Sequence, residues 1–152
     1  MQEHFEVIAR GVCIKSGKIL LCQTKGSPIT YLPGGHVDFM ETARESLERE
    51  IMEELACASV AGKFLGMIEH SFIQKGQRHC EWNAFFELKI SDLNPDEDVS
   101  AAEEHLQFKW CELDELESAK LEPAVLLDLL PQWLASPQRE TACWTSAGDF
   151  VR

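Results

Sequence analysis

The chain has 152 residues, of which 45% are hydrophobic and 26% are charged, and its formal net charge is −12. This length suits one domain with a single hydrophobic core, and the composition is that of an ordinary globular protein. The negative charge argues against nucleic acid as a partner, because the chain would repel phosphate groups unless a cation lay between them.

Strands are expected first along the chain. Apolar runs over residues 7–14 and 18–23 flank the turn signal Lys15-Ser16-Gly17, and this pattern predicts a hairpin. Residues 31–37 are short, extended and interrupted by glycine, so they predict a strand followed by a loop.

The clearest helix signal covers residues 41–57, which contain no Gly or Pro. Apolar side chains recur there at every fourth residue: Ala43, Leu47, Ile51 and Leu55. This spacing gives one apolar stripe and predicts an amphipathic helix.

The second half of the chain begins with two apolar and aromatic segments, residues 64–73 and 82–90. Lys75-Gly76-Gln77 bridges them, which predicts paired strands. Residues 92–104 are acidic and contain Asn94-Pro95, so a loop is expected, and residues 108–110 predict a last strand.

Two further segments, residues 113–116 and 123–134, are typical of helices, and Pro123 suits a first helical turn. No repeat or linker divides the chain, so the sequence predicts one domain over residues 1–136. Residues 137–152 show no clear period and are predicted to form a C-terminal tail. Strands around one acidic helix, with a helix at the end, favour a layered α/β domain.

The six cysteines are scattered and form no C-x-x-C pair: Cys13, Cys22, Cys57, Cys80, Cys111 and Cys143. Most lie in apolar segments, where a free thiol behaves as a small hydrophobic group. Neither a disulfide framework nor a zinc site is therefore expected. The N-terminus has no secretory signal and no apolar stretch could cross a bilayer, so the sequence predicts a cytoplasmic protein without a membrane partner.

Three carboxylates on the predicted helix carry the functional signal. Glu50, Glu53 and Glu54 are spaced i, i+3 and i+4, so they lie in one arc of the helix. Their mutual repulsion would become coordination around a divalent cation, and Mg²⁺ prefers carboxylate oxygens. The alternative is a solvated acidic face, which the triplet alone would favour.

The surrounding pattern resembles the signature of the Nudix hydrolase superfamily, whose members include MutT-like enzymes. Gly35 is followed by five residues, then Glu41, then seven residues, then the segment Arg49 to Cys57. Every charged position of the signature matches at its spacing. Two positions depart from it: Ala56 replaces a Gly, and Cys57 replaces an aliphatic residue. A change from Gly to Ala should be tolerated unless that position needs a positive φ.

The resemblance implies an α+β fold, a three-layer α/β/α sandwich with a mixed β-sheet. It implies Mg²⁺ as cofactor, with Mn²⁺ as a substitute, and a small nucleotide as the partner. Arg49 would orient the carboxylates, and Glu41 would tie the loop to the helix. The Gly35 carbonyl would help three carboxylates to bind the metal: Glu50, Glu53 and Glu54.

Family members often recruit one more acid from a loop, and the acidic stretch offers Glu97, Glu103 and Glu104. Glu104 is our first choice and Glu103 the second, with a solvated loop carboxylate as the alternative for either. Lys25 and Tyr31 lie where relatives place phosphate-contacting and base-stacking side chains.

Trp82 could stack on a nucleobase, although a buried strand with ordinary packing is the commoner reading of such a segment. Lys25 and Tyr31 have similar alternatives, as a loop lysine and a core residue. Residues 71–75 carry neither the Pro typical of relatives acting on ADP-ribose nor the Tyr of those acting on diadenosine polyphosphates.

The function expected is magnesium-dependent hydrolysis of a phosphoanhydride bond in a nucleoside diphosphate linked to another moiety, such as a nucleoside triphosphate. The first alternative is a Nudix-fold module that binds nucleotide or regulates without turnover. The second is an acidic interaction domain, which would leave Gly35 and Glu41 unexplained. Relatives are often dimers, so a homodimer is one oligomeric state that the family offers.

Overall fold

The computed structural model describes residues 3–135 and 142–145, and in these ranges the strands form two sheets. The larger sheet has the order β4 (Gly34–His36), β1 (Glu3–Val12), β6 (Gln77–Lys89), β5 (Val60–Gln74) and β8 (Ala142–Thr145). The smaller sheet has the order β2 (Ile14–Lys15), β3 (Lys18–Thr24) and β7 (Leu106–Glu112). β1 runs parallel to β6 and β5 parallel to β8, whereas the other pairs are antiparallel, so the larger sheet is mixed.

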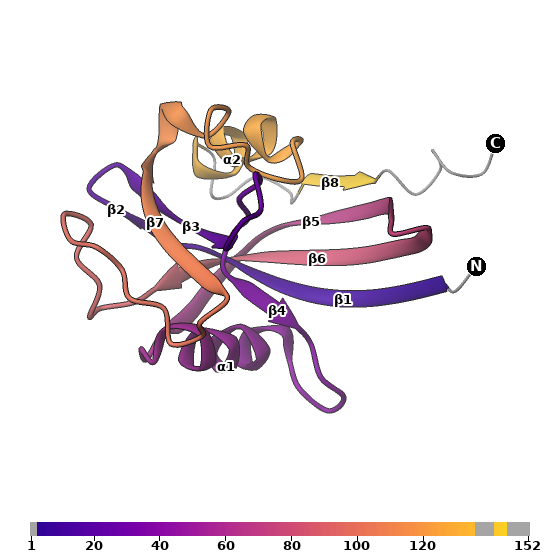
Figure 1. The fold of residues 1–152 in the computed structure, drawn as a ribbon, viewed down its shortest axis with the longest axis horizontal. Coiled ribbons are helices and arrows are strands. Elements are labelled where there is room, and N and C mark those ends of the chain that lie inside the picture. The colour runs from indigo at the N-terminus through magenta and orange to yellow at the C-terminus, as the bar shows by residue number, and fades with distance from the viewer. Residues whose placement is uncertain (1–2, 136–141, 146–152) are drawn as a thin grey trace.

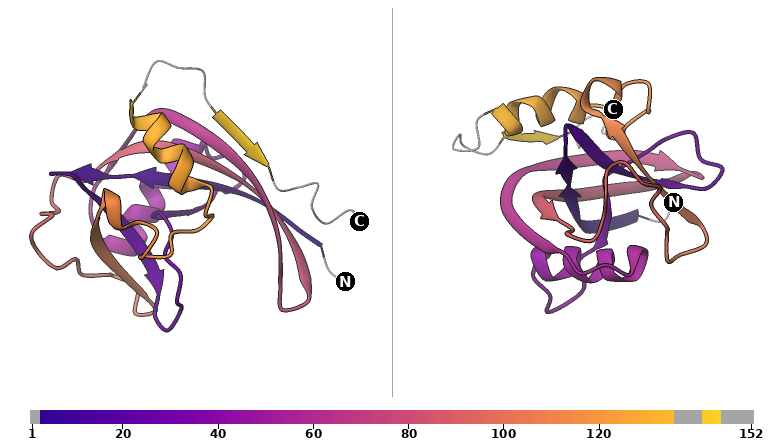
Figure 2. Two further views of the ribbon diagram at one scale, coloured as in Figure 1. Left: turned by 90° about the horizontal axis from the view of Figure 1, so that it is seen from above. Right: turned by 90° about the vertical axis from the view of Figure 1, so that its left-hand side faces the viewer.

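Helices cover both sides of these strands (Figure 1). α1 (Ala43–Leu55) packs on one side, and α2 (Leu126–Ala135) lies on the other, following the short 3₁₀ helix η1 (Leu113–Glu115). The two further views show the same arrangement from above and from the side (Figure 2). The predicted three-layer sandwich with a mixed sheet is therefore confirmed.

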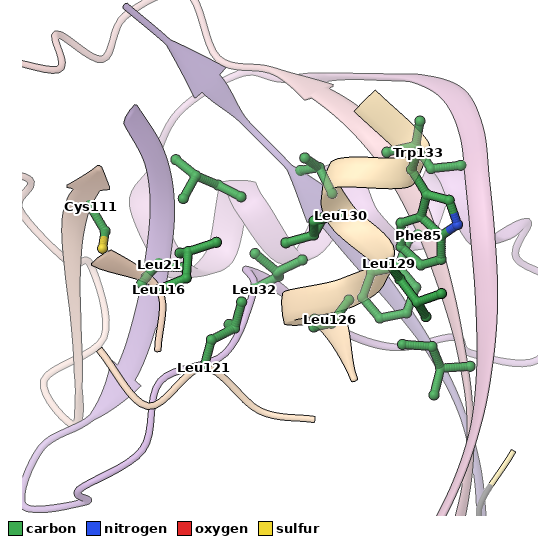
Figure 3. Close-up of a cluster of buried hydrophobic side chains, with 14 residues drawn as sticks. Leu21, Leu32, Phe85, Cys111, Leu116, Leu121, Leu126, Leu129, Leu130 and Trp133 are labelled. Carbon is green, nitrogen blue, oxygen red and sulfur yellow. The ribbon is translucent and has the colours of Figure 1, made fainter. Parts of the chain in front are cut away.

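Each helix has its own hydrophobic core. Leu47 and Ile51 of α1 are fully buried against residues such as Leu20 and Phe86. On the other side, Leu126 and Trp133 of α2 pack in a cluster that includes Phe85 (Figure 3). Two separate cores leave the strands between them buried from both faces, which fixes the position of α1 relative to the sheets.

The predicted pairing of the first two apolar runs is correct only at the turn. Ile14 and Lys15 pair with Ile19 and Lys18 as expected. Most of the first run, however, is β1, which pairs with β4 and β6 in the other sheet. An apolar run indicates a strand but does not name its partner, which explains the difference. The predicted pairing of residues 64–73 with 82–90 is confirmed by the antiparallel β5–β6 pair.

Helix α1 is shorter than the predicted range of 41–57 because its two ends are fixed locally. At the start, the Thr42 hydroxyl accepts a hydrogen bond from the Glu45 amide at 3.2 Å. The Glu45 carboxylate in turn accepts one from the Thr42 amide at 2.8 Å, which completes a capping box. At the other end, Ala56 has a φ of +53° and stops the helix.

Ala56→Gly should stabilise the protein by roughly 1 kcal/mol, because a non-glycine residue in the left-handed region costs about that much. Ala56 is exposed, so no buried methyl group is lost. The free energy of unfolding from urea titration checks this. Ala58→Gly is the matched control: Ala58 is also exposed but has no positive φ, so that change should be neutral or slightly destabilising. Equal effects of the two substitutions would contradict the argument.

The C-terminal part agrees only in outline with the sequence prediction. α2 begins at Leu126 rather than at Pro123, because the preceding residues form turns. The tail predicted over residues 137–152 lies outside the described residues, except for β8, which extends the larger sheet next to β5. In the described ranges, no helix is long and apolar enough to span a membrane.

Candidate active site

Arg49 joins the loop after β4 to helix α1. Its Nε and Nη2 atoms donate to the two carboxylate oxygens of Glu41 at 2.8 and 3.0 Å. The same Nη2 also donates to the His36 carbonyl at 3.0 Å. A two-pronged contact of this kind is geometrically specific, so the loop is held in one position against the helix. The Arg49 guanidinium also lowers the pKa of the Glu41 carboxyl below its usual value.

Arg49 also holds two of the three predicted metal ligands. Its Nη1 donates to Glu50 at 3.0 Å and to Glu53 at 3.3 Å. The Glu50 side chain is 17% exposed, whereas that of Glu53 is 50% exposed. The hydrogen bonds to Glu41 first, and then to Glu50 and Glu53, raise the pKa of Arg49, so its positive charge is fixed beside the acidic helix. Glu53 is the more open of the two carboxylates.

Glu54 is the buried member of the triplet, with only 7% of the residue exposed. Burial, followed by the negative charge of Glu50, raises its pKa to about 8. Arg10 opposes the rise, and Glu103 adds to it. The Oε2 atom of Glu54 is buried without a hydrogen-bond partner among the described residues. A buried carboxylate in this state needs either a proton or a cation.

Gly35 lies directly against Glu50. A Cβ atom on Gly35 would stand 2.6 Å from both carboxylate oxygens of Glu50, so a larger residue would push this side chain away. The turn at Gly34 and Gly35 therefore brings backbone close to the acidic face of α1. Carboxylate and carbonyl oxygens are the donors that Mg²⁺ prefers, and the residues present fit a hard divalent cation.

The three carboxylates do not converge on one point as they stand. Among the described residues, no group of three or more His, Cys, Asp or Glu side chains is placed to hold a metal ion. Arg49 accounts for this, because it draws Glu50 and Glu53 to itself while Glu54 points into the interior. The assignment of Glu50, Glu53, Glu54 and the Gly35 carbonyl as metal ligands therefore stays a prediction.

The raised pKa of Glu54 makes the stability of the metal-free protein depend on pH. Between the ordinary carboxyl value of 4.5 and about 8, the folded protein retains a proton that the unfolded chain loses. Its stability should therefore fall as the pH rises through this window, with a slope of at most about 1.4 kcal/mol per pH unit. Urea titrations in a chelator, compared with Glu54→Gln, isolate this group; identical pH profiles would contradict the burial argument.

Of the acids proposed outside the helix, Glu103 is brought closest to the triplet. The Ala102 amide donates to the Glu54 carbonyl at 2.7 Å, and the charge of Glu103 acts on Glu54. Glu103 also lies 3.4 Å from His105. Glu104, the first choice from the sequence, is exposed and has no described contact with the cluster. Glu97 accepts from Asn94 within its own loop, away from α1.

A cavity of about 400 Å³ lies on the α2 side of the larger sheet. Arg10 connects it to the acidic helix: its Nη1 atom donates to the carbonyls of Leu32 and Gly34, both at 3.1 Å. Leu32 lines the cavity, and Gly34 leads into the turn against Glu50. Arg10 therefore links the wall of the cavity to the backbone turn that lies against the acidic helix.

The structure brings only one of the three sequence-derived substrate residues to this cavity. Tyr31 lines it, with the Arg10 guanidinium 5.2 Å above its ring. Lys25 is exposed in a turn. Its backbone amide donates a hydrogen bond to the His105 carbonyl. Trp82 is on the opposite face of β6 from the cavity, in edge contact with Phe5 at 5.7 Å.

Sequence reasoning missed Arg10, Glu81 and Asn83, which all line the cavity. A signal was present for Arg10, because it is the one charged residue between Val7 and Ile14. Glu81 and Asn83 alternate along β6 and so share a face. The sequence alone could not predict which face of the sheet these two side chains occupy, because it does not say which face α1 covers.

The chain matches the model of the family described as NUDIX domain over residues 5–132. No curated protein matches it. The MutT protein from Methanosarcina mazei Go1 is 21% identical with a TM-score of 0.65, over 91% of this chain and 99% of that one. The E. coli ORF135 protein is 24% identical with a TM-score of 0.62, over 90% and 93%. An ADP-ribose pyrophosphatase from Streptococcus suis is 18% identical with a TM-score of 0.56, over 93% and 98%. These likenesses show a shared fold.

Proposed function

The chain belongs to the NUDIX domain family and is a pyrophosphohydrolase, and we propose that it hydrolyses a phosphoanhydride bond in a nucleoside diphosphate linked to another moiety, with Mg²⁺ as cofactor. One observation carries the proposal. Glu54 is buried beside Glu50, near the turn where Gly35 touches the acidic helix, and one of its oxygens has no partner within residues 3–135 and 142–145. An acidic protein can accept phosphates at such a place once a cation lies between them.

The residues that would hold the cation are Glu50, Glu53 and Glu54, with the Gly35 carbonyl and Glu103 as further oxygen donors. When bound, a divalent cation neutralises charge on the phosphate oxygens and favours deprotonation of water. Mn²⁺ accepts the same oxygen ligands and should substitute. Arg49 keeps Glu50 and Glu53 oriented while Glu41 anchors it from the loop.

The chain's own groups then divide the chemical work. A water molecule attacks phosphorus, the bond to the bridging oxygen breaks, and that oxygen leaves with the electron pair. A carboxylate must accept the proton of the water, and Glu54 is our candidate because it is the buried member of the acidic cluster. Arg10, between the cavity and Gly34, is placed to hold the nucleotide in register.

A substrate panel tests the proposal. We expect product release with Mg²⁺ or Mn²⁺, and none in a chelator, from at least one of four classes: nucleoside triphosphates, ADP-ribose, diadenosine polyphosphates and nucleotide sugars. Glu69→Gln serves as a control, because Glu69 lies on β5 on the Trp82 side of the sheet and does not line the cavity. Silence across the panel from folded protein would favour a nucleotide-binding module without turnover.

A further inference from the structure

The cavity beside α2 is lined by both apolar and titratable side chains. Aromatic and aliphatic side chains line much of it, including Tyr31, Phe72 and Leu126. The titratable groups on its walls are Arg10, Tyr31, His70, Glu81 and Glu122. Its volume of about 400 Å³ is within the range of small-molecule sites, which are mostly apolar with a few placed polar groups.

The carboxylates make this cavity a poor place for phosphate. Glu81 and Glu122 both line it, and Arg10 turns one nitrogen away to the carbonyls of Leu32 and Gly34. A nucleotide would therefore place its phosphates at the acidic helix with a cation and its base in the cavity. The distance allows this, since the three residue steps from Leu32 to Gly35 span at most about 11 Å.

Glu81 and Asn83 lie two residues apart on one face of β6, and both line the cavity. The Asn83 Nδ2 atom donates to Glu81 Oε2 at 3.1 Å. A carboxylate only accepts hydrogen bonds, so this contact fixes the amide with its nitrogen toward Glu81 and its oxygen away. Asn83 is 3% exposed, so its amide is held in this orientation within the wall of the cavity. Asn83 Oδ1 and the Glu81 carboxylate thus give the cavity wall two hydrogen-bond acceptors.

We propose that this cavity selects guanine, with Glu81 and Asn83 as the specificity-determining pair. Guanine is the ordinary nucleobase whose pairing edge carries two neighbouring N–H donors, the ring N1–H and the exocyclic amino group. Adenine and cytosine each offer one donor beside a ring acceptor, which would face a carboxylate or amide oxygen unfavourably. Uracil offers a single ring N–H between two carbonyl groups. The inference rests on the proposed function, because it names the base of the same substrate.

The wild-type protein gives the first test through kcat/KM for GTP, ITP, ATP and CTP with Mg²⁺. Hypoxanthine in ITP keeps the ring N1–H but lacks the exocyclic amino group, so we expect the order GTP, then ITP, then ATP and CTP. A good two-pronged contact discriminates by about 1–3 kcal/mol, which corresponds to roughly 5- to 150-fold between GTP and ATP. Equal values for the four nucleotides would overturn the inference and leave the proposed function intact.

Glu81→Gln gives the second test, because it replaces one acceptor oxygen by a donor NH₂ group. The preference for GTP over ATP should fall toward 1, because GTP loses a hydrogen bond while kcat/KM for ATP should change little. Glu69→Gln, on the other face of the sheet, should keep the wild-type preference. An unchanged GTP to ATP ratio in folded Glu81→Gln would exclude this carboxylate as the selecting group.

Calorimetric binding of GMP and AMP in a chelator separates the two proposals, since it needs neither metal nor turnover. We expect GMP to bind wild-type protein more tightly than AMP, and Glu81→Gln to remove the difference. Selective GMP binding without any turnover would retain the guanine site and reject the enzymatic reaction proposed for it. Turnover without any selectivity for GMP would do the opposite.

Discussion

Glu54→Gln should lower turnover with Mg²⁺ by roughly 10²- to 10⁴-fold, the range expected when a group that accepts a proton in the reaction is removed. Its side chain is buried, and its Oε2 atom has no hydrogen-bond partner in the part of the chain that the structure describes. Glutamine keeps the shape but can neither accept the proton nor offer a charged oxygen to a cation. The measurement is kcat on the substrate that the panel identifies.

The same substitution should leave the fold intact and make the metal-free protein more stable at pH 8. Glutamine removes the charge that burial and Glu50 disfavour. Glu48→Gln is the matched control on the same helix: Glu48 accepts from the Ala61 amide at 2.8 Å, which a glutamine oxygen can also do. Its activity should stay near the wild-type value. Full activity in Glu54→Gln would remove Glu54 from the proposed mechanism.

The acidic face of α1 could be predicted because it depends on local geometry alone. Residues at i, i+3 and i+4 share a helix face whatever surrounds them, so the grouping of Glu50, Glu53 and Glu54 follows from their spacing. Their unequal burial could not be predicted. It depends on the Gly34–Gly35 turn and on Ala102, whose amide reaches the Glu54 carbonyl from a distant loop.

The layered fold was likewise predictable, whereas the partners of the strands were not. β1 looked like half of a hairpin and instead lies parallel to β6, more than sixty residues away along the chain. That pairing decides which residues line the cavity. It places Arg10 beside Phe85, on the same face as Asn83, and leaves Trp82 on the other side. Specificity residues on a sheet become visible only when the register is known.

The effect of Ala56 on the end of helix α1 could not be predicted from the sequence either. The departure from the family signature was visible in the sequence, but its consequence depended on the backbone angle. The φ of +53° shows that this position does need the left-handed conformation that glycine adopts freely. The chain therefore carries strain at the end of the helix that bears its acidic groups, and Ala56→Gly measures it.

Arg49→Lys should lower activity by roughly 10- to 100-fold, the usual effect of losing a group that orients metal ligands. Lysine keeps the positive charge but has a single nitrogen. It cannot bind both oxygens of Glu41 and the His36 carbonyl while also reaching Glu50 and Glu53. The loop and the carboxylates would lose their fixed relation, so half-maximal activity should also require more Mg²⁺.

Arg44→Lys is the control, since Arg44 lies on the same helix and donates to the Gly62 carbonyl at 2.9 Å, away from the acidic cluster. It should alter stability slightly and leave the Mg²⁺ dependence unchanged. If Arg49 acted only on stability, both variants would show the same Mg²⁺ curve as the wild type once folded. A shift in that curve for Arg49→Lys alone would identify Arg49 as the residue that positions the carboxylates. A general loss of stability would not change the Mg²⁺ concentration that folded protein needs for half-maximal activity.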